Sequence, residues 1–262
     1  MQNVYKHYCS TSSMAFENFD KYILQRPETL EEILGILESI PKPTRTITEC
    51  LGDMSVALAT LDLGTEYSIV GGYAVLAHLV SRFGDRIFPI WRGANDIDMV
   101  GSQRVLNALH ATYNLKQYQL NHSIKNKYTL RIPGTTESDP ECKIDFVLDR
   151  NVYRHSSETE EIMILGILIR VLTPLALIKG KLEAARSGEK HIIDIVHLLG
   201  VLEHRKAAPM DIVKTFNSKE RLLLYNCLSD GFDPHVCNTR VNIGPTRTYV
   251  RSLRSELHNR AY

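Results

Sequence analysis

The chain has 262 residues, which places it between a large single domain and a small pair of domains. Hydrophobic residues make up 44% and charged residues 23%, a globular composition with ample material for a core. A formal net charge of +1 excludes a global electrostatic attraction to nucleic acid or to an anionic membrane. Any RNA partner therefore has to meet a local basic patch.

Cysteine usage and hydropathy argue against a disulfide framework, a zinc site, a membrane span and a signal peptide. The five cysteines are odd in number and form no CxxC pair, which favours reduced thiols in a cytoplasmic protein over a disulfide framework. His235 and Cys237 have no second ligand pair at zinc spacing. The apolar run at 162–178 is broken by Arg170 and Pro174, so it predicts no membrane span. The N-terminus has no apolar signal-peptide core. We expect a soluble cytoplasmic protein with no membrane partner.

The N-terminal part is predicted to be helical. Leu30, Ile33, Leu34 and Leu37 recur at helical spacing within residues 29–40. A second helix is expected over residues 48–61, closed by a glycine at position 64.

The middle of the chain changes to a mixture of strands and helices. Strands are predicted by their apolar patterning at 67–70, 96–100, 127–132, 142–148 and 167–172. Helices are predicted over 73–81, after the cap Ser102, from the cap Thr173 to about 188, over 190–204 and over 209–229. Residues 84–93 are expected to form a loop.

This order indicates an α/β (α+β) fold, with a mixed sheet flanked by helices and a helical C-terminal part. We place a domain boundary near residue 155. Residues 1–155 would hold the N-terminal helices and the α/β core, and residues 156–262 a mainly helical domain.

Three features of the core are suited to one chemistry. Gly71 and Gly72 open a helix, where backbone amides can approach a phosphate. Asp96 and Asp98 alternate on a strand and therefore point to the same face. Asp145 lies on a later strand between apolar residues and needs a partner. Clustered carboxylates repel one another unless a cation bridges them, and hard oxygen ligands favour Mg²⁺.

The segments GGYAVLAH at 71–78 and RGANDID at 92–98 resemble the nucleotidyltransferase (polymerase-beta-like) superfamily. They are most similar to the AbiEii-type toxins and related minimal nucleotidyltransferases. The segment around Lys181, Gly188 and Asp194 resembles the helical lysine and aspartate segment of that family. The resemblance covers roughly residues 67–200.

The resemblance implies a role for each matched residue. Asp96, Asp98 and Asp145 would be catalytic and would bind two Mg²⁺ ions, or Mn²⁺ in their place, which clamp the entering and leaving oxygens. Gly71 and Gly72 would hold the phosphates. Lys181, with Arg92 or Lys179, would bind the nucleotide and neutralise the departing pyrophosphate. Asp194 would orient the lysine or the nucleotide.

The resemblance also implies partners: a nucleoside triphosphate, an RNA such as the 3′ end of a tRNA or a protein side chain as acceptor, and a cognate antitoxin. Two substitutions against the family pattern, Gly72 for serine and Ala94 for a hydroxyl residue, leave a second reading open. In that reading the chain is a nucleotide-binding or regulatory module without catalysis. A kinase-like transfer of the terminal phosphoryl group is a third reading.

Several of these residues also have a purely structural interpretation. Asp145 could pair with Lys143 or Arg131, Lys181 could be solvated, and Asp194 could be a charge favoured at a helix start. His78 and Trp91 are expected to be packing residues. The C-terminal arginines, with Val250, Leu253 and Leu257 at helical spacing among them, fit a docked amphipathic helix or an RNA-contacting edge.

Overall fold

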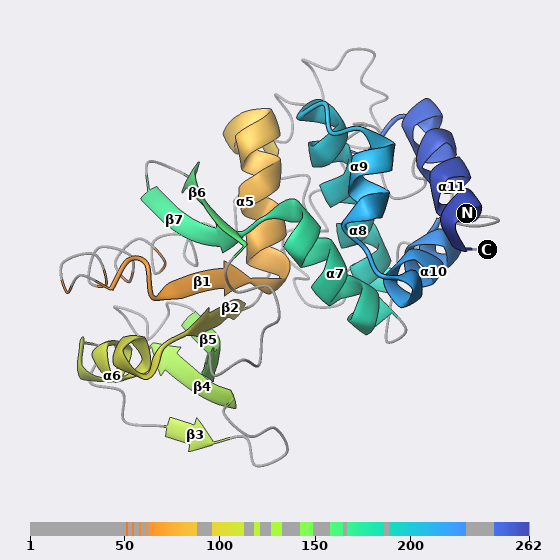
Figure 1. Ribbon diagram of the computed structural model, residues 1–262. Coiled ribbons are helices and arrows are strands. Elements are labelled where there is room, and N and C mark those ends of the chain that lie inside the picture. Colours follow the sequence, from red (N-terminus) through yellow and green to blue (C-terminus); the bar gives the residue numbers. More distant parts are fainter. Residues whose placement is uncertain are drawn as a thin grey trace, which may run out of the picture.

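The computed structural model describes residues 51, 54, 58, 61, 63–87, 96–112, 118–120, 127–132, 142–148, 158–164, 167–185, 189–228 and 244–261 (Figure 1). The predicted helix at 29–40, Trp91, Arg92 and Ala94 lie outside these residues. Of the predicted helix at 48–61, Leu51, Met54 and Leu58 are described. They are helical and fully buried.

A seven-stranded mixed sheet forms the centre of the molecule, in the order β3-β4-β5-β2-β1-β7-β6. Its members are β1 (Tyr67–Val70), β2 (Asp96–Gly101), β3 (Tyr118–Leu120), β4 (Lys127–Ile132), β5 (Cys142–Leu148), β6 (Thr159–Ile164) and β7 (Ile167–Leu172). β1 is antiparallel to β2 and parallel to β7, while β2 is parallel to β5. The fold is α/β, as predicted.

The five predicted strands are all present, and two more were missed. β3 has three residues, too few for a periodic pattern to stand out. β6 begins Thr-Glu-Glu and pairs only with β7 in a hairpin at the sheet edge, where Glu161 is exposed and Glu160 contacts His78. Both β6 and β7 follow residue 155 in the chain and still belong to the same sheet. A domain division at residue 155 stays a prediction.

The helices of the core follow the sequence signals. α5 (Gly71–Phe83) continues directly from β1 and passes into a short 3-10 turn, η1 (Gly84–Ile87), in the predicted loop. α6 (Gln103–Thr112) follows Ser102, whose hydroxyl accepts a hydrogen bond from the Val105 amide at 3.2 Å. α7 (Pro174–Ala184) has Thr173 as its cap and proline in its first turn. α8 (Glu189–His204) comes next.

The prediction of one helix over 209–229 is wrong. The segment forms α9 (Pro209–Lys214) and α10 (Ser218–Cys227), separated at residues 215–217. Asn217 accepts a hydrogen bond from the Glu220 amide, and the Glu220 side chain accepts one from the Asn217 amide. This capping box starts a new helix where the apolar spacing alone suggested a continuous one.

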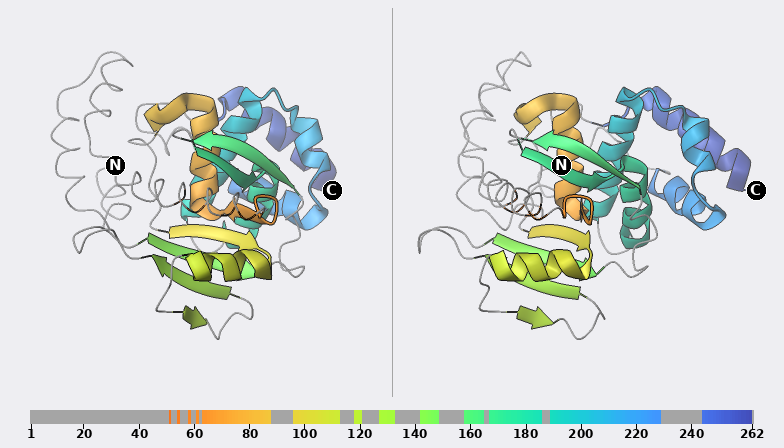
Figure 2. Two further views of the ribbon diagram at one scale, coloured as in Figure 1. Left: turned by 90° about the vertical axis from the view of Figure 1, so that its left-hand side faces the viewer. Right: turned by 60° about the vertical axis from the view of Figure 1, so that its left-hand side comes forward.

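The chain ends in α11 (Arg247–Ala261), which packs on α9 and α10. Val250, Leu253 and Leu257 are buried at helical spacing, so this is the docked amphipathic helix that the sequence predicted. In Figure 2, α9, α10 and α11 are grouped at one end of the molecule in both views, away from α6.

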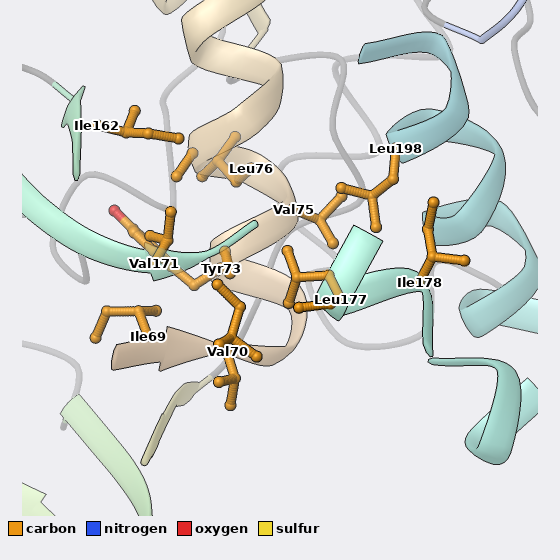
Figure 3. Packing of buried hydrophobic residues seen from close by; sticks show 14 of the residues in the cluster. Ile69, Val70, Tyr73, Val75, Leu76, Ile162, Val171, Leu177, Ile178 and Leu198 are labelled. Atoms are coloured by element: carbon orange, nitrogen blue, oxygen red, sulfur yellow. The ribbon is translucent and has the colours of Figure 1, made fainter. Parts of the chain in front are cut away.

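α5 is the centre of the core. It lies between the β6–β7 hairpin and α8 (Figure 1), and its residues from Tyr73 to Val80 are buried. Val75 and Leu76 point to different neighbours, with Leu198 of α8 near the first and Ile162 of β6 near the second (Figure 3). One helix therefore joins the sheet to the helical part. Within the described part of the chain, no helix has the length and apolar character needed to cross a membrane.

Candidate active site

Three carboxylates meet where β1 ends and β2 and β5 begin. In the parallel pair β2–β5, Asp98 is aligned with Asp145 and Asp96 with Lys143. Carboxylate oxygens of Asp96, Asp98 and Asp145 all lie within 4.8 Å of one another. The structure thus brings together the three predicted metal ligands.

The strand periodicity explains why these acids share one face. Ile97 and Met99 alternate with Asp96 and Asp98 and are fully buried on the opposite face of β2. A one-residue slip would move the acids into the core, so the apolar residues fix the register. Asp145 is itself buried, with 8% of its surface exposed, and Oδ1 accepts a hydrogen bond from the Thr129 hydroxyl at 2.9 Å.

Lys143 lies against the same cluster. Its Nζ donates to Asp145 Oδ2 at 3.1 Å and to Asp96 Oδ2 at 3.2 Å. Partial burial disfavours the charged amine, but the hydrogen bonds and charges of the two aspartates outweigh burial and raise the pKa of Lys143. The alternative reading in which Asp145 pairs with Lys143 is therefore correct as a contact. The contact of Lys143 with Asp96 was not predicted, because it depends on the β2–β5 register.

Gly71 brings the backbone against the carboxylates. Its φ is +66°, and a Cβ built on it would lie 1.9 Å from Asp98 Oδ2. A side chain is therefore excluded both by the left-handed backbone and by contact. The first turn of α5 contains no acidic residue, and its N-cap, Val70, makes no side-chain capping hydrogen bond. Because β1 and β2 pair Val70 with Asp98, this helix start adjoins the acids.

The residues at this edge fit a divalent metal ion. The donors are three carboxylates, the hard oxygen ligands that Mg²⁺ and Mn²⁺ prefer. Their oxygens are close enough for one ion to contact more than one of them. The adjoining helix N-terminus favours an anionic group such as a phosphate beside the metal.

Lys181 and Asp194 form a separate, buried ion pair between α7 and α8. Lys181 Nζ donates to Asp194 Oδ2 at 2.6 Å, with side-chain exposures of 9% and 0%. The reading of Lys181 as a solvated helix lysine is therefore wrong. That Asp194 orients this lysine for a nucleotide stays a prediction.

Lys179 projects differently from Lys181. Its ammonium is 3.9 Å from Glu158 Oε1 and 5.9 Å from the centroid of the Phe216 ring. Residues two positions apart on a helix differ by about 200° in direction, and the two lysines accordingly contact different carboxylates. Arg92, the remaining predicted nucleotide-binding residue, lies outside the described residues.

His78 is a packing residue, as the sequence suggested. It is fully buried, and its Nε2 donates to the Leu172 carbonyl at 2.7 Å. Burial lowers the pKa of His78 to about 4, against the opposing effects of the Leu172 carbonyl and Glu160. Glu160 and Arg205 cover its other nitrogen. The imidazole links α5 to β6, β7 and the turn after α8, and is neutral at pH 7.

No protein-family model matches the chain, and no curated protein matches it. Seven chains among the solved structures do match. The crystal structure of ANT(2″)-Ia in complex with adenylyl-2″-tobramycin has 15% identity and a TM-score of 0.43, covering 70% of this chain and 97% of its own. A solution structure of ANT(2″)-Ia has 16% identity and a TM-score of 0.43, covering 70% and 90%.

A nucleotidyltransferase-like protein from Paracoccidioides brasiliensis has 14% identity and a TM-score of 0.45, covering 67% of this chain and 84% of its own. At these levels of similarity, the function has to be inferred from the site itself.

Proposed function

We propose that the chain is a nucleotidyltransferase of the polymerase-beta-like superfamily, which transfers a nucleoside monophosphate from a triphosphate to a hydroxyl group. The observation that carries this is the carboxylate cluster of Asp96, Asp98 and Asp145, within 4.8 Å and beside a helix start that only glycine permits. Carboxylates for a metal and backbone amides for a phosphate are the two parts that this transfer needs.

Each part of the site has a task in the transfer. The acceptor oxygen forms a bond to the α-phosphorus, and the bond from that phosphorus to the bridging oxygen breaks to release pyrophosphate. The acceptor proton leaves through the carboxylate cluster to water. The α5 amides after Gly71 would hold the phosphate oxygens, with Gly72 leaving the approach open. Mg²⁺, or Mn²⁺, held by the three aspartates would neutralise the triphosphate charge and align the reacting oxygens.

The lysines and Asp194 would act on the leaving group. The ion pair fixes the Lys181 ammonium on α7 and leaves it donors beyond the one used by Asp194. We assign to Lys181 the stabilisation of the departing pyrophosphate and to Asp194 its positioning, with Arg92 or Lys179 supplying further positive charge.

The acceptor and setting follow from the likeness of residues 71–78 and 92–98 to the AbiEii-type toxins. In this proposal the chain is a cytoplasmic toxin with a cognate antitoxin, and its acceptor is the 3′ end of an RNA such as tRNA, or a protein side chain.

One observation favours a second candidate, a nucleotide-binding or regulatory module without catalysis. Lys143 already contacts two of the three carboxylates, so it offsets part of their charge without a metal. A module of this kind would bind triphosphate without Mg²⁺ and release no pyrophosphate.

The test is to incubate the purified chain with each α-labelled triphosphate, Mg²⁺ and total RNA, beside the Asp96→Asn, Asp98→Asn double variant. We expect label on RNA or protein with the wild type, reduced on the order of 100-fold or more in the variant, because a metal supplies several kcal/mol to the transition state. Label from a γ-labelled triphosphate alone would show a kinase instead. Retained transfer by the folded double variant would end the proposal.

A further inference from the structure

A shallow basic pocket lies on the outer face of the C-terminal helices. It has a volume of about 290 Å³ and is lined by Tyr225 of α10 and by Arg251, Arg254, Ser255 and His258 of α11. We call these five residues the α10–α11 pocket. It contains two arginines, a histidine and a tyrosine ring, and none of its lining residues in the described part of the chain is acidic.

The surrounding helix face is also basic. On α11, Arg247 lies one turn before Arg251 on this face, Arg260 lies on the opposite side, and Glu256 is the one acidic residue. Arg251 and His258 are exposed, while the apolar residues of the same helix are buried against α9 and α10. The chain as a whole carries only +1, so this positive charge is local. A local cationic face binds a polyanion electrostatically without making the whole protein basic.

The aromatic geometry points to a nucleic acid as the polyanion. The Arg254 guanidinium lies 5.8 Å from the centroid of the Tyr225 ring, and the His258 ring centroid lies 6.1 Å from it at a tilt of 35°. In single-strand binding sites arginines contact the phosphates, and an aromatic ring beside them stacks on an unpaired base. An acidic protein partner would use the charge but not the rings.

The pocket is connected to the proposed active site through α7. α10 packs on α7, the helix that carries Lys181. In Figure 1 the β1 arrow points towards α7, and α10 lies beyond α7. α7 also contacts α5, whose first residue adjoins the carboxylates, so it connects the proposed active site with a helix that lines the pocket.

We propose that the α10–α11 pocket binds single-stranded RNA, with Arg251 and Arg254 on phosphates and Tyr225 stacking on a base, and that it holds the acceptor strand. This rests on the proposed function, because an acceptor strand has a role only if the carboxylate cluster transfers a nucleotide. It makes RNA, and not a protein side chain, the acceptor class.

The test is fluorescence anisotropy of the full chain with a short labelled single-stranded RNA, titrated at several salt concentrations. For the Arg251→Ala, Arg254→Ala variant we expect binding about 20- to 30-fold weaker at about 0.1 M salt. The slope of log affinity against log salt should fall by about 1.4, because each phosphate contact on a single strand contributes about 0.7. Tyr225→Ala should weaken binding about 5-fold or more with an unchanged slope, since it removes stacking.

A matched control removes two positive charges elsewhere. Lys190 of α8 and Lys214 of α9 are exposed, and neither lines the pocket. The Lys190→Gln, Lys214→Gln variant has the same net charge as the arginine double variant and should keep both affinity and slope. Equal loss in both double variants would overturn the pocket, because it would show only an effect of total charge. Stronger competition by poly-glutamate than by unlabelled RNA would also overturn it.

The Asp96→Asn, Asp98→Asn variant separates this inference from the proposed function. It should bind RNA as the wild type does and transfer no label. RNA binding that depends on the pocket, without transfer by the wild type, would remove the proposed function and leave an RNA-binding surface. If the arginine double variant transfers nucleotide to RNA as fully as the wild type, the pocket has no part in the reaction, and the proposed enzyme remains.

Discussion

Two clusters of charge in this molecule differ in how their charges are balanced. At the sheet edge, three aspartates lie within 4.8 Å, and a partly exposed Lys143 contacts two of them. Between α7 and α8, Lys181 and Asp194 form a pair that is almost fully buried. The first cluster gathers like charges at an accessible edge, and the second matches opposite charges inside the protein.

We infer from this difference that the aspartate cluster binds a ligand and that the Lys181–Asp194 pair stabilises the structure around it. Carboxylates that lie close together raise the free energy of the folded state unless a cation lies between them. Their closeness therefore argues for the binding of a metal ion. In a buried ion pair the two opposite charges compensate each other, and removing one partner leaves an uncompensated buried charge. We therefore expect substitutions at the sheet edge to change metal and nucleotide binding, and substitutions at the buried pair to change stability as well.

The largest expected effect on stability is at the buried pair. Lys181→Met should lower the free energy of unfolding by about 3–5 kcal/mol, because Asp194 is left charged and buried. This corresponds to a fall of about 10 °C in Tm. Adding Asp194→Leu should recover part of the loss, since the orphaned charge is removed. The Asp96→Asn, Asp98→Asn variant should melt no lower than the wild type. Equal Tm values for Lys181→Met and the wild type would remove the contrast between the two clusters.

The helical scaffold should also lose stability in acid through His78. Its folded pKa is about 4, below the ordinary value of 6.5, so the unfolded chain takes up a proton first as the pH falls. The contribution is fully present above pH 6.5 and is lost between pH 6.5 and 4, by about 3 kcal/mol in total.

Thermal unfolding of the wild type and His78→Gln across this pH range measures the effect. The free energy of unfolding of the variant should fall less steeply as the pH decreases. The difference in slope should correspond to one proton fewer taken up on unfolding. His204→Gln, a change at an exposed histidine of α8, should keep the wild-type slope. Parallel slopes for all three proteins would contradict a neutral buried His78.

Gly71 tests the contact between the helix start and the carboxylates. Gly71 and Gly84 both have positive φ, but a Cβ at Gly84 would meet nothing within 4 Å. Each change to alanine should cost about 1–3 kcal/mol of backbone strain. Only Gly71→Ala displaces Asp98, so only it should weaken Mg²⁺ and triphosphate binding in calorimetry. Equal binding by the two variants would show that the close approach at Gly71 has no part in the site.

Lys143 gives the smallest and most specific effect. It occupies carboxylate oxygens that a metal needs, so Lys143→Gln should tighten Mg²⁺ binding about ten-fold. That is about 1.4 kcal/mol, between the values for a unit charge pair at about 4 Å in water and near a protein surface. Arg104→Gln, at an exposed α6 arginine paired with Glu66, removes the same charge elsewhere and should leave the affinity unchanged. Weaker binding by Lys143→Gln would show that the lysine supports the metal site.

The local parts of the fold could be read from the sequence, and the pairings between them could not. Apolar patterning predicted five of the seven strands of the described sheet, and glycines and aspartates marked the site. Which strand lies beside β2 depends on tertiary packing, so the contact of Lys143 with Asp96 was not predictable. The burial of Lys181 likewise depends on how α7 meets α8. The break before α10 was readable, because Asn217 and Glu220 have capping-box spacing.

The most direct test of the carboxylate site is calorimetry with a non-hydrolysable nucleoside triphosphate, with and without Mg²⁺. It should compare the wild type with the Asp96→Asn, Asp98→Asn variant. We predict that the wild type binds the triphosphate only when Mg²⁺ is present, and that the variant, although folded, loses this binding. Triphosphate binding that needs no Mg²⁺ and is the same in the variant would contradict the metal site and identify a binding module without catalysis.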